Sequence, residues 1–365
     1  MRSVALAPLR LLVPPLVSTS YKGQAGKVGV VGGCFEYTGA PFYAALSALK
    51  VGADLSHVFC DEAAAVPIKS YSPELIVHGC LSQGSGIDEV EVARQADEVT
   101  RWFPALTALV IGPGLGRDET LQAVASLVVQ RAVAANLPCV LDADGLRVAL
   151  ANPSLVRGAK WVILTPNKPE YGRLVAALSG GGSGDTGGAT RGDTGTGTGT
   201  GTGTDTGTGA GGTLTGTGGG NDDEGESVRA LAQGLAGPTI VRKGPRDIIS
   251  DGRAILECTE EGCLKRCGGQ GDVLAGSIAT FAGWARAAEA SGRLAAAAEP
   301  NSRAPQPSAP MLAAYAGCLL TRRFARAAFQ RHRRSMTAPD LIEAIGGVFD
   351  EFAPVDGADG GVDVH

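Results

Sequence analysis

The sequence predicts an α/β protein with a mostly parallel central sheet and helices on both faces. Five short runs of β-branched or apolar residues alternate with longer stretches whose apolar residues recur at helical spacing. Strands that alternate with helices in this way usually pair in parallel. Each run is followed by a loop rich in glycine or polar side chains, as expected where ligands bind beyond the carboxyl ends of parallel strands.

The predicted strands are the runs at residues 27–31, 108–111, 138–141, 161–164 and 239–242. One predicted helix begins near Pro41, because proline is favoured in the first turn of a helix. Apolar residues from 273 to 281 and from 312 to 331 predict two more helices. Thr337, followed three residues later by Asp340, predicts the N-cap of a last helix.

Composition excludes several classes of protein. The chain has 365 residues, 44% of them hydrophobic, and a net charge of −5 without a basic face, which argues against a nucleic-acid or anionic-membrane partner. No apolar run reaches the length of a membrane span. The eight cysteines form no CxxC motif and no histidine pair has metal spacing, so reduced thiols are expected rather than zinc or disulfides.

Two low-complexity segments interrupt the pattern. Residues 180–226 are rich in glycine and threonine, and residues 287–310 in alanine, proline and serine. The first offers almost no apolar surface to bury, so a flexible surface insertion is expected there, and the second is expected to be another loop insertion. Because the α/β pattern resumes after each, we expect a single domain over residues 14–350, with an N-terminal extension over 1–13 and a tail over 351–365.

The glycine-rich segment 266–272 is the most informative loop. Gly268, Gly269 and Gly271 precede Asp272, and a helical pattern follows at once. A helix N-terminus offers unpaired N–H groups and a partial positive charge to an anion, and glycines allow close approach of a phosphate. Asp272 would then accept a proton from a hydroxyl that attacks the phosphate. Alternatively, this is a tight turn in which Asp272 caps the helix.

The loops after the other strands carry further candidates. Asn167 and Glu170 would share one helix face, either beside a magnesium ion held through water or as an N-cap with an acidic first turn. Lys243 would neutralise phosphate charge or be solvated. Asp142 and Asp144 would support the site or form a buried turn with satisfied carboxylates. Residues 34–37 are expected near a pocket or an interface.

The loop motifs occur in one order: a GGCFEYTGAP segment at 32–41, KVGAD at 50–54, GPGLGR at 112–117, DADGL at 142–146, LTPN at 164–167, KGPRD at 243–247 and RCGGQGD at 266–272. This order closely resembles the ATP-dependent NAD(P)H-hydrate dehydratases of the eukaryotic type. The resemblance implies a ribokinase-like fold. It also implies conversion of (6S)-NADHX and (6S)-NADPHX to NADH and NADPH, with release of ADP and phosphate.

The resemblance implies roles for matching residues. It implies that ATP contacts Lys243, Gly244, Pro245, Arg246, Asp247, Gly262, Cys263, Leu264, Lys265, Arg266, Cys267, Gly268, Gly269, Gln270 and Gly271. It implies that the hydrate contacts Gly116, Asn167, Lys168, Pro169, Glu170, Tyr171, Gly172, Arg173 and Asp272. Asp272 is the expected catalytic base, and Mg²⁺ is expected near Glu170 through water.

The expected ligands are ATP, Mg²⁺ and the two hydrates, and an NAD(P)HX epimerase is the expected functional partner. The oligomeric state stays open, with a homo-oligomer as one outcome. A cytoplasmic location is favoured over a mitochondrial or plastid one, because mature family sequence begins near Pro14 and leaves little room for a transit peptide. Two rival functions remain: a kinase of the same fold acting on a small alcohol such as a hydroxymethylpyrimidine or hydroxyethylthiazole, and a nucleotide-binding sensor without turnover.

Overall fold

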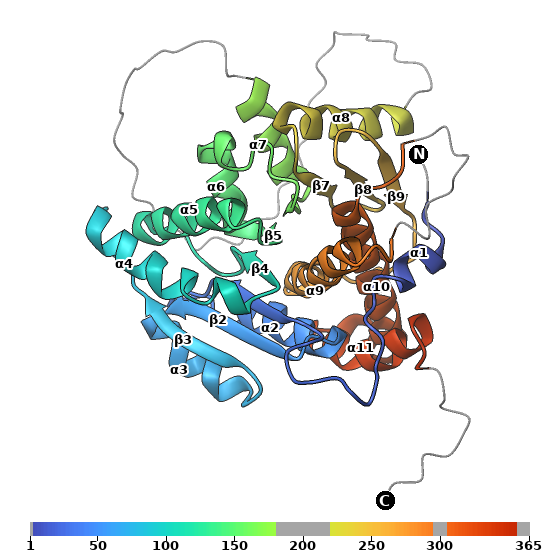
Figure 1. Ribbon diagram of the computed structural model, residues 1–365, viewed down its shortest axis with the longest axis horizontal. Coiled ribbons are helices and arrows are strands. Elements are labelled where there is room, and N and C mark those ends of the chain that lie inside the picture. The colour runs from blue at the N-terminus through green and yellow to red at the C-terminus, as the bar shows by residue number, and fades with distance from the viewer. Residues whose placement is uncertain (1–2, 180–219, 295–304, 356–365) are drawn as a thin grey trace, which may run out of the picture.

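The computed structural model describes residues 3–179, 220–294 and 305–355 (Figure 1). Within these ranges, nine strands form one sheet in the order β3-β2-β1-β4-β5-β6-β7-β8-β9. The strands are β1 (Lys27–Val31), β2 (Leu55–Asp61), β3 (Ile76–Leu81), β4 (Ala108–Ile111), β5 (Cys139–Leu141), β6 (Val162–Leu164), β7 (Thr239–Arg242), β8 (Asp247–Ser250) and β9 (Ile255–Cys258). Neighbours from β3 to β7 pair in parallel, whereas β7–β8 and β8–β9 pair antiparallel. The predicted mostly parallel sheet is confirmed.

Helices cover both faces of the sheet. The helices are α1 (Leu6–Arg10), α2 (Gly39–Val51), α3 (Glu62–Tyr71), α4 (Glu89–Thr100), α5 (Glu119–Ala134), α6 (Leu146–Ala151), α7 (Lys168–Ser179), α8 (Gly220–Leu235), α9 (Gln270–Ala290), α10 (Ala309–His332) and α11 (Ala338–Phe352). In Figure 1, α4 to α6 line one side of the sheet, and α9 to α11 lie on the other. Within the described ranges, no helix is long and apolar enough to cross a bilayer.

Two apolar clusters, one on each face, hold these layers together. Along β4, Val110 belongs to the cluster packed against α2, α9 and α10, whereas Leu109 and Ile111 belong to the cluster packed against α4 to α8. All four residues of β4 are buried. A strand covered on both faces has no polar side, which is why the sequence shows continuous apolar runs there.

Helix α9 lies in the middle of its layer and is packed closely by its neighbours. A Cβ placed on Gly276 would lie 2.1 Å from the carbonyl oxygen of Ala44 in α2. On the side of α10, a Cβ placed on Gly317 would lie 2.4 Å from Cγ1 of Ile278. These two glycines therefore let the backbones of three helices approach one another, and they fix the position of the N-terminus of α9.

The five predicted strands are present, two of them one residue shorter at the start than predicted. The predicted helices also form: Thr337 and Asp340 make a capping box at α11, and α10 begins three residues before the predicted start. Strands β2, β3, β8 and β9 were not predicted. β2 contains His57 and Asp61, β3 is a half-exposed edge strand, and β8 and β9 have only four residues each.

Several predicted boundaries move. Helix α8 begins at Gly220, inside the segment 180–226, and residues 180–219 of that segment lie outside the described ranges. Helix α9 extends to Ala290, and α10 begins at Ala309, so the second segment is shorter than predicted as well. Within the predicted extension, Leu9 and Leu12 are fully buried and pack on the domain. Helix α11 likewise continues to a buried Phe352, inside the predicted tail.

A histidine pair between β2 and β3 makes the stability of the fold depend on pH. His57 is 3% exposed, its Nδ1 lies 3.1 Å from Nε2 of His78, and both rings contact Trp102. Burial, and then the neighbouring His78, lower the pKa of His57 to about 4. The unfolded chain therefore binds a proton at this histidine at a higher pH than the folded protein does.

We expect the contribution of His57 to lower the free energy of unfolding by about 3 kcal/mol as the pH falls from about 6.5 to about 4. Urea denaturation at a series of pH values measures this slope. The His57→Gln variant cannot take up the proton, so its slope should be smaller over the same interval. Equal slopes for the two proteins would contradict the assignment.

Candidate active site

The loops after the parallel strands meet at one edge of the sheet, as predicted. Backbone N–H groups link these loops to the ends of neighbouring strands: Gly112, after β4, donates to Val31 O, at the end of β1, at 2.9 Å. Asp142 N similarly donates to Ile111 O at 3.1 Å. Gly112 has a φ of 120°, and a Cβ there would lie 1.9 Å from the carbonyl oxygen of Asp142. Only glycine allows these two loops to pack together.

A buried ion pair joins three of these loops. Nζ of Lys243, after β7, lies 2.6 Å from Oδ1 of Asp142, after β5. The hydroxyl of Thr165, after β6, donates to the same oxygen at 2.6 Å. Burial would lower the pKa of Lys243, but Asp142, Glu170 and Asp272 outweigh it and hold this pKa above its usual value. Lys243 is therefore a paired, charged residue of the site, and Asp142 is a satisfied buried carboxylate.

The glycine loop brings Asp272 to this ion pair. Gly269, with a φ of 92°, is the N-cap of α9, so Asp272 lies in the first turn and does not cap the helix. A Cβ placed on Gly271 would lie 3.6 Å from Asp142 Oδ2 and 3.7 Å from Lys243 Nζ. Burial, and then the charge of Asp142, raise the pKa of Asp272 well above its usual value, although Lys243 opposes the shift. Asp272 is therefore a better proton acceptor than an exposed aspartate.

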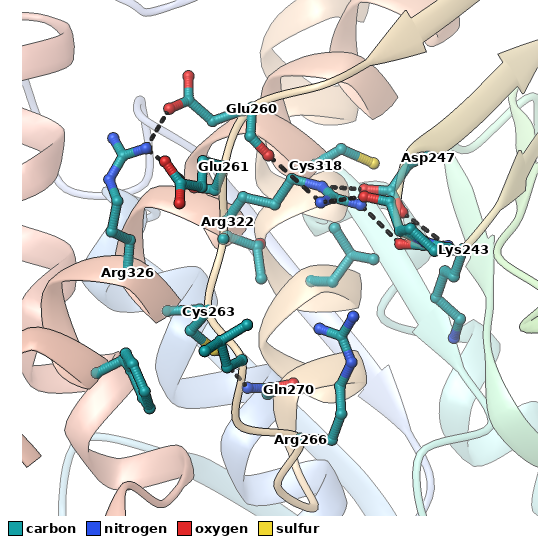
Figure 2. Close-up of a pocket in the computed structure, with 18 of the residues that line it drawn as sticks. Lys243, Asp247, Glu260, Glu261, Cys263, Arg266, Gln270, Cys318, Arg322 and Arg326 are labelled. Atoms are coloured by element: carbon teal, nitrogen blue, oxygen red, sulfur yellow. Dashed lines mark hydrogen bonds and ion pairs between the residues drawn. The ribbon is translucent and has the colours of Figure 1, made fainter. Parts of the chain in front are cut away.

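A cavity of about 1200 Å³ lies beside the glycine loop, between the β7–β8 turn and α10 (Figure 2). Eleven of the residues predicted to contact ATP line it: Lys243, Gly244, Pro245, Asp247, Gly262, Cys263, Leu264, Arg266, Cys267, Gln270 and Gly271. Segments 243–247 and 262–271, which are distant in sequence, thus face one cavity. Its volume is sufficient for a nucleoside triphosphate.

Other lining residues were not predicted from the sequence. Glu260 and Glu261 come from the segment after β9, and Arg322 and Arg326 come from α10. Figure 2 shows these four side chains on one wall of the cavity, opposite Arg266 and Gln270. Only the helical spacing of α10 could be read from the sequence, and in that spacing an arginine facing a cavity does not differ from one facing solvent.

Some of the predicted ATP contacts are directed elsewhere. The guanidinium of Arg246 pairs with the carboxylate of Glu257 and lies 3.7 Å from that of Glu224. Lys265, Gly268 and Gly269 are not among the residues that line the cavity. Gly269 instead packs against α11, since a Cβ there would lie 2.5 Å from Cβ of Ala338.

The Asn167–Glu170 pair caps α7. Asn167 N donates to Glu170 Oε2 at 2.8 Å, and Glu170 N donates to Asn167 Oδ1 at 3.0 Å, so each side chain caps the backbone of the other. This bears out the capping alternative. Asn167 also lines the large cavity, and Glu170 contributes to the raised pKa of Lys243, so both residues remain beside the site.

The remainder of segment 167–173 divides between surface and core. Lys168, Pro169, Gly172 and Arg173 are exposed. Tyr171 packs into the apolar cluster on the α5–α8 face, and its hydroxyl lies 2.7 Å from Oγ of Ser227. The ring therefore supports the attachment of α7 to α8, and the contact of Tyr171 with the hydrate stays a prediction.

A second cavity, of about 510 Å³, lies where the strand order changes direction, between the loops after β1 and β4. Cys34, Glu36 and Tyr37 line it together with Gly116 and Asp144. The amide of Gly116 donates to Asp144 Oδ2 at 3.0 Å. Such a change of strand order is the usual ligand site in open parallel sheets. The predicted substrate contact at Gly116 thus lies in a cavity separate from the one that the glycine loop lines.

Comparison with known proteins agrees with this arrangement. The family model described as NAD(P)H-hydrate dehydratase matches residues 28–346. The human protein named ATP-dependent (S)-NAD(P)H-hydrate dehydratase is 42% identical over 341 residues, which cover 93% of this chain and 82% of the human protein. The chain belongs to the NAD(P)H-hydrate dehydratase family. The order of the loop motifs had already indicated this family.

Solved structures agree with the fold of this NAD(P)H-hydrate dehydratase family member. A ribokinase-like superfamily protein from Enterococcus faecalis superposes with a TM-score of 0.64 at 18% identity, with 96% of each chain covered. An ADP/ATP-dependent NAD(P)H-hydrate dehydratase from Bacillus subtilis, co-crystallised with ATP and Mg²⁺, superposes with a TM-score of 0.59 at 18% identity. That match covers 95% of this chain and 97% of the Bacillus chain. The fold is therefore ribokinase-like.

The charges around Asp272 lead to a test of its environment. Asp142 raises the pKa of Asp272, so the Asp142→Asn variant should lower that pKa, and Lys243, freed of its partner, would act in the same direction. Titration of the ¹³C-labelled Asp272 carboxyl by NMR measures the shift. Asp144→Asn is the matched control, because Asp144 lies in the same loop but binds Gly116. Equal shifts in the two variants would show that Asp142 is not the source.

Proposed function

We propose that this chain catalyses the ATP-dependent dehydration of (6S)-NADHX and (6S)-NADPHX to NADH and NADPH, with release of ADP and phosphate. Membership of the family supports the activity. The observation that carries the mechanism is Asp272, a carboxylate of raised pKa at the start of α9, beside Lys243 and next to the large cavity.

Phosphorylation solves the chemical difficulty of this reaction. Hydroxide is a poor leaving group, so direct loss of the ring hydroxyl at neutral pH is slow. In the proposed mechanism, Asp272 takes the hydroxyl proton while the oxygen attacks the γ-phosphorus of ATP, and the bond to the β–γ bridging oxygen breaks. The ring nitrogen lone pair then expels phosphate, and loss of a proton from the adjacent ring carbon restores the dihydronicotinamide.

The residues around the large cavity would bind the triphosphate. The N–H groups at the start of α9 lie beside Gly271 and are suited to stabilise negative charge on the transferring phosphoryl group. Arg266 lines the cavity, and no hydrogen bond or ion pair engages its guanidinium within the described residues. It is therefore available to an anion. We propose that the hydrate extends from the second cavity, where Gly116 and Asp144 lie, to Asp272.

The residues present fit a magnesium ion that accompanies ATP. No group of three or more His, Cys, Asp or Glu side chains within the described ranges could hold a metal alone. Mg²⁺ often binds through one or two carboxylates, phosphates and water, and Glu170, near Lys243, supplies such a carboxylate. Bound there, the ion would neutralise phosphate charge. Asn167 would keep the Glu170 carboxylate oriented.

The two rival functions differ in their products. A kinase of a small alcohol would release a phosphorylated product, whereas this reaction restores the absorbance of the dihydronicotinamide. A sensor would have no use for a base of raised pKa at position 272. Family membership and Asp272 together favour the dehydratase.

We also propose a cytoplasmic location. We further propose functional pairing with an NAD(P)HX epimerase, because only one epimer of the hydrate serves as substrate. A mitochondrial or plastid form is the alternative location. A homo-oligomer is one outcome for the assembly.

The Asp272→Asn variant tests the base. Turnover should fall by roughly 10²–10⁴-fold, as is typical when a general base is lost, while the affinity for ATP changes little. Gly271 and Arg266, which are proposed to contact phosphate, are unaltered in this variant. Stopped-flow absorbance with the hydrate and calorimetry with ATP measure the two quantities. Near-normal turnover would remove Asp272 from the mechanism.

The nucleotide and metal requirements form a separate test. We expect hydrate repair to require Mg²⁺ and to run faster with ATP than with ADP. The names of the eukaryotic relatives specify ATP. Titrations of both nucleotides, with and without EDTA, measure these requirements. Restoration of activity by added Mg²⁺ is the control. Equal rates with ADP, or full activity in EDTA, would contradict the expectation.

A further inference from the structure

One arginine of α10 connects the segments that form the wall of the large cavity. Nε of Arg322 donates to Asp247 Oδ2 at 2.7 Å, and its terminal nitrogens donate to the carbonyl oxygens of Gly244 at 2.8 Å and Pro245 at 2.9 Å. A longer bond, of 3.3 Å, reaches the carbonyl oxygen of Glu260. Figure 2 shows this guanidinium between Asp247 and Glu260.

The β7–β8 turn depends on these contacts. Oδ1 of Asp247 accepts a hydrogen bond from Gly244 N at 3.1 Å, so the carboxylate closes the turn while its other oxygen binds Arg322. Asp247 is 6% exposed, and the Arg322 side chain is 14% exposed. A buried carboxylate without a partner is unfavourable, so removal of Arg322 would disturb the shape of the turn.

A guanidinium has the geometry that this position requires. It carries five N–H donors in one plane, and four acceptors from two separate segments surround Arg322. A lysine ammonium would keep the charge beside Asp247 but has only three donors. The hydrogen-bond pattern therefore selects arginine over a general cation.

The neighbouring arginine offers a comparison. Among the residues that the structure describes, Arg323 binds only the carboxylate of Glu260, at 3.0 and 3.1 Å, and Arg326 binds the same carboxylate at 2.7 Å. Loss of Arg323 would thus leave Glu260 held by Arg326 and would not touch the turn. The two adjacent residues of α10 differ in whether they hold the segment Gly244–Asp247.

We propose that Arg322 is a positioning residue of the nucleotide site. It holds the β7–β8 turn and the backbone at Glu260 against α10, so that the cavity has its binding shape before ATP enters. Binding then requires no ordering of the turn, so the favourable contacts with ATP are not offset by a loss of conformational entropy in this segment. The inference rests on the proposed function for the identity of the nucleotide.

The test measures ATP binding apart from turnover. Calorimetry with a non-hydrolysable ATP analogue and Mg²⁺ gives the dissociation constant for the wild-type protein, Arg322→Met, Arg322→Lys and the matched control Arg323→Met. We expect Arg322→Met to weaken binding by roughly 10- to 100-fold, by analogy with the loss of residues that orient the ligands of a metal. Arg322→Lys should lie between Arg322→Met and the wild type. Arg323→Met should bind like the wild type.

Steady-state kinetics separate positioning from a general structural role. KM for ATP should rise in Arg322→Lys while KM for the hydrate stays unchanged and kcat changes little. A parallel change in both KM values, together with a lower Tm, would show a merely structural role and overturn the inference. If Arg322→Met does not fold, Arg322→Lys decides the outcome, and analogue binding equal to that of the wild type would overturn the inference. Absence of analogue binding in the wild type would instead contradict the proposed function.

Discussion

The ion pair between Asp142 and Lys243 is the interaction on which the site depends. It joins the ends of β5 and β7, Thr165 connects β6 to it, and the first turn of α9 lies against it. Asp142 is 2% exposed, so loss of either partner would leave a poorly solvated charge, typically at a cost of about 3–5 kcal/mol. The pair fixes the relative position of three strand ends and also sets the electrostatic environment of Asp272.

Glycines make this compact arrangement sterically feasible. Where Gly112 approaches Asp142, and where Gly276 approaches Ala44, any side chain would collide with backbone atoms. The first contact brings two loops together at the sheet edge, and the second presses α9 against α2. The contact with α2 holds α9 so that its first turn lies beside the ion pair.

The sequence was sufficient to predict local features and insufficient for contacts that depend on tertiary packing. Runs such as 108–111 are apolar on both faces and were predicted correctly, whereas β2 contains His57 and Asp61 and was missed. The glycine loop before Asp272 was evident from its composition. The pairing of Arg322 could not be predicted, because its partner Asp247 lies 75 residues away in sequence and side-chain pairing over that distance leaves no periodic pattern.

The cap of α7 has a consequence for how a metal could use Glu170. One oxygen of this carboxylate already accepts the N–H of Asn167, which leaves a single oxygen for any further ligand. Chelation by both oxygens would require the first turn of α7 to release its own backbone. A cation at Glu170 would therefore be bound through one oxygen or through water, and only chelation by both oxygens would be thermodynamically linked to the fraying of α7.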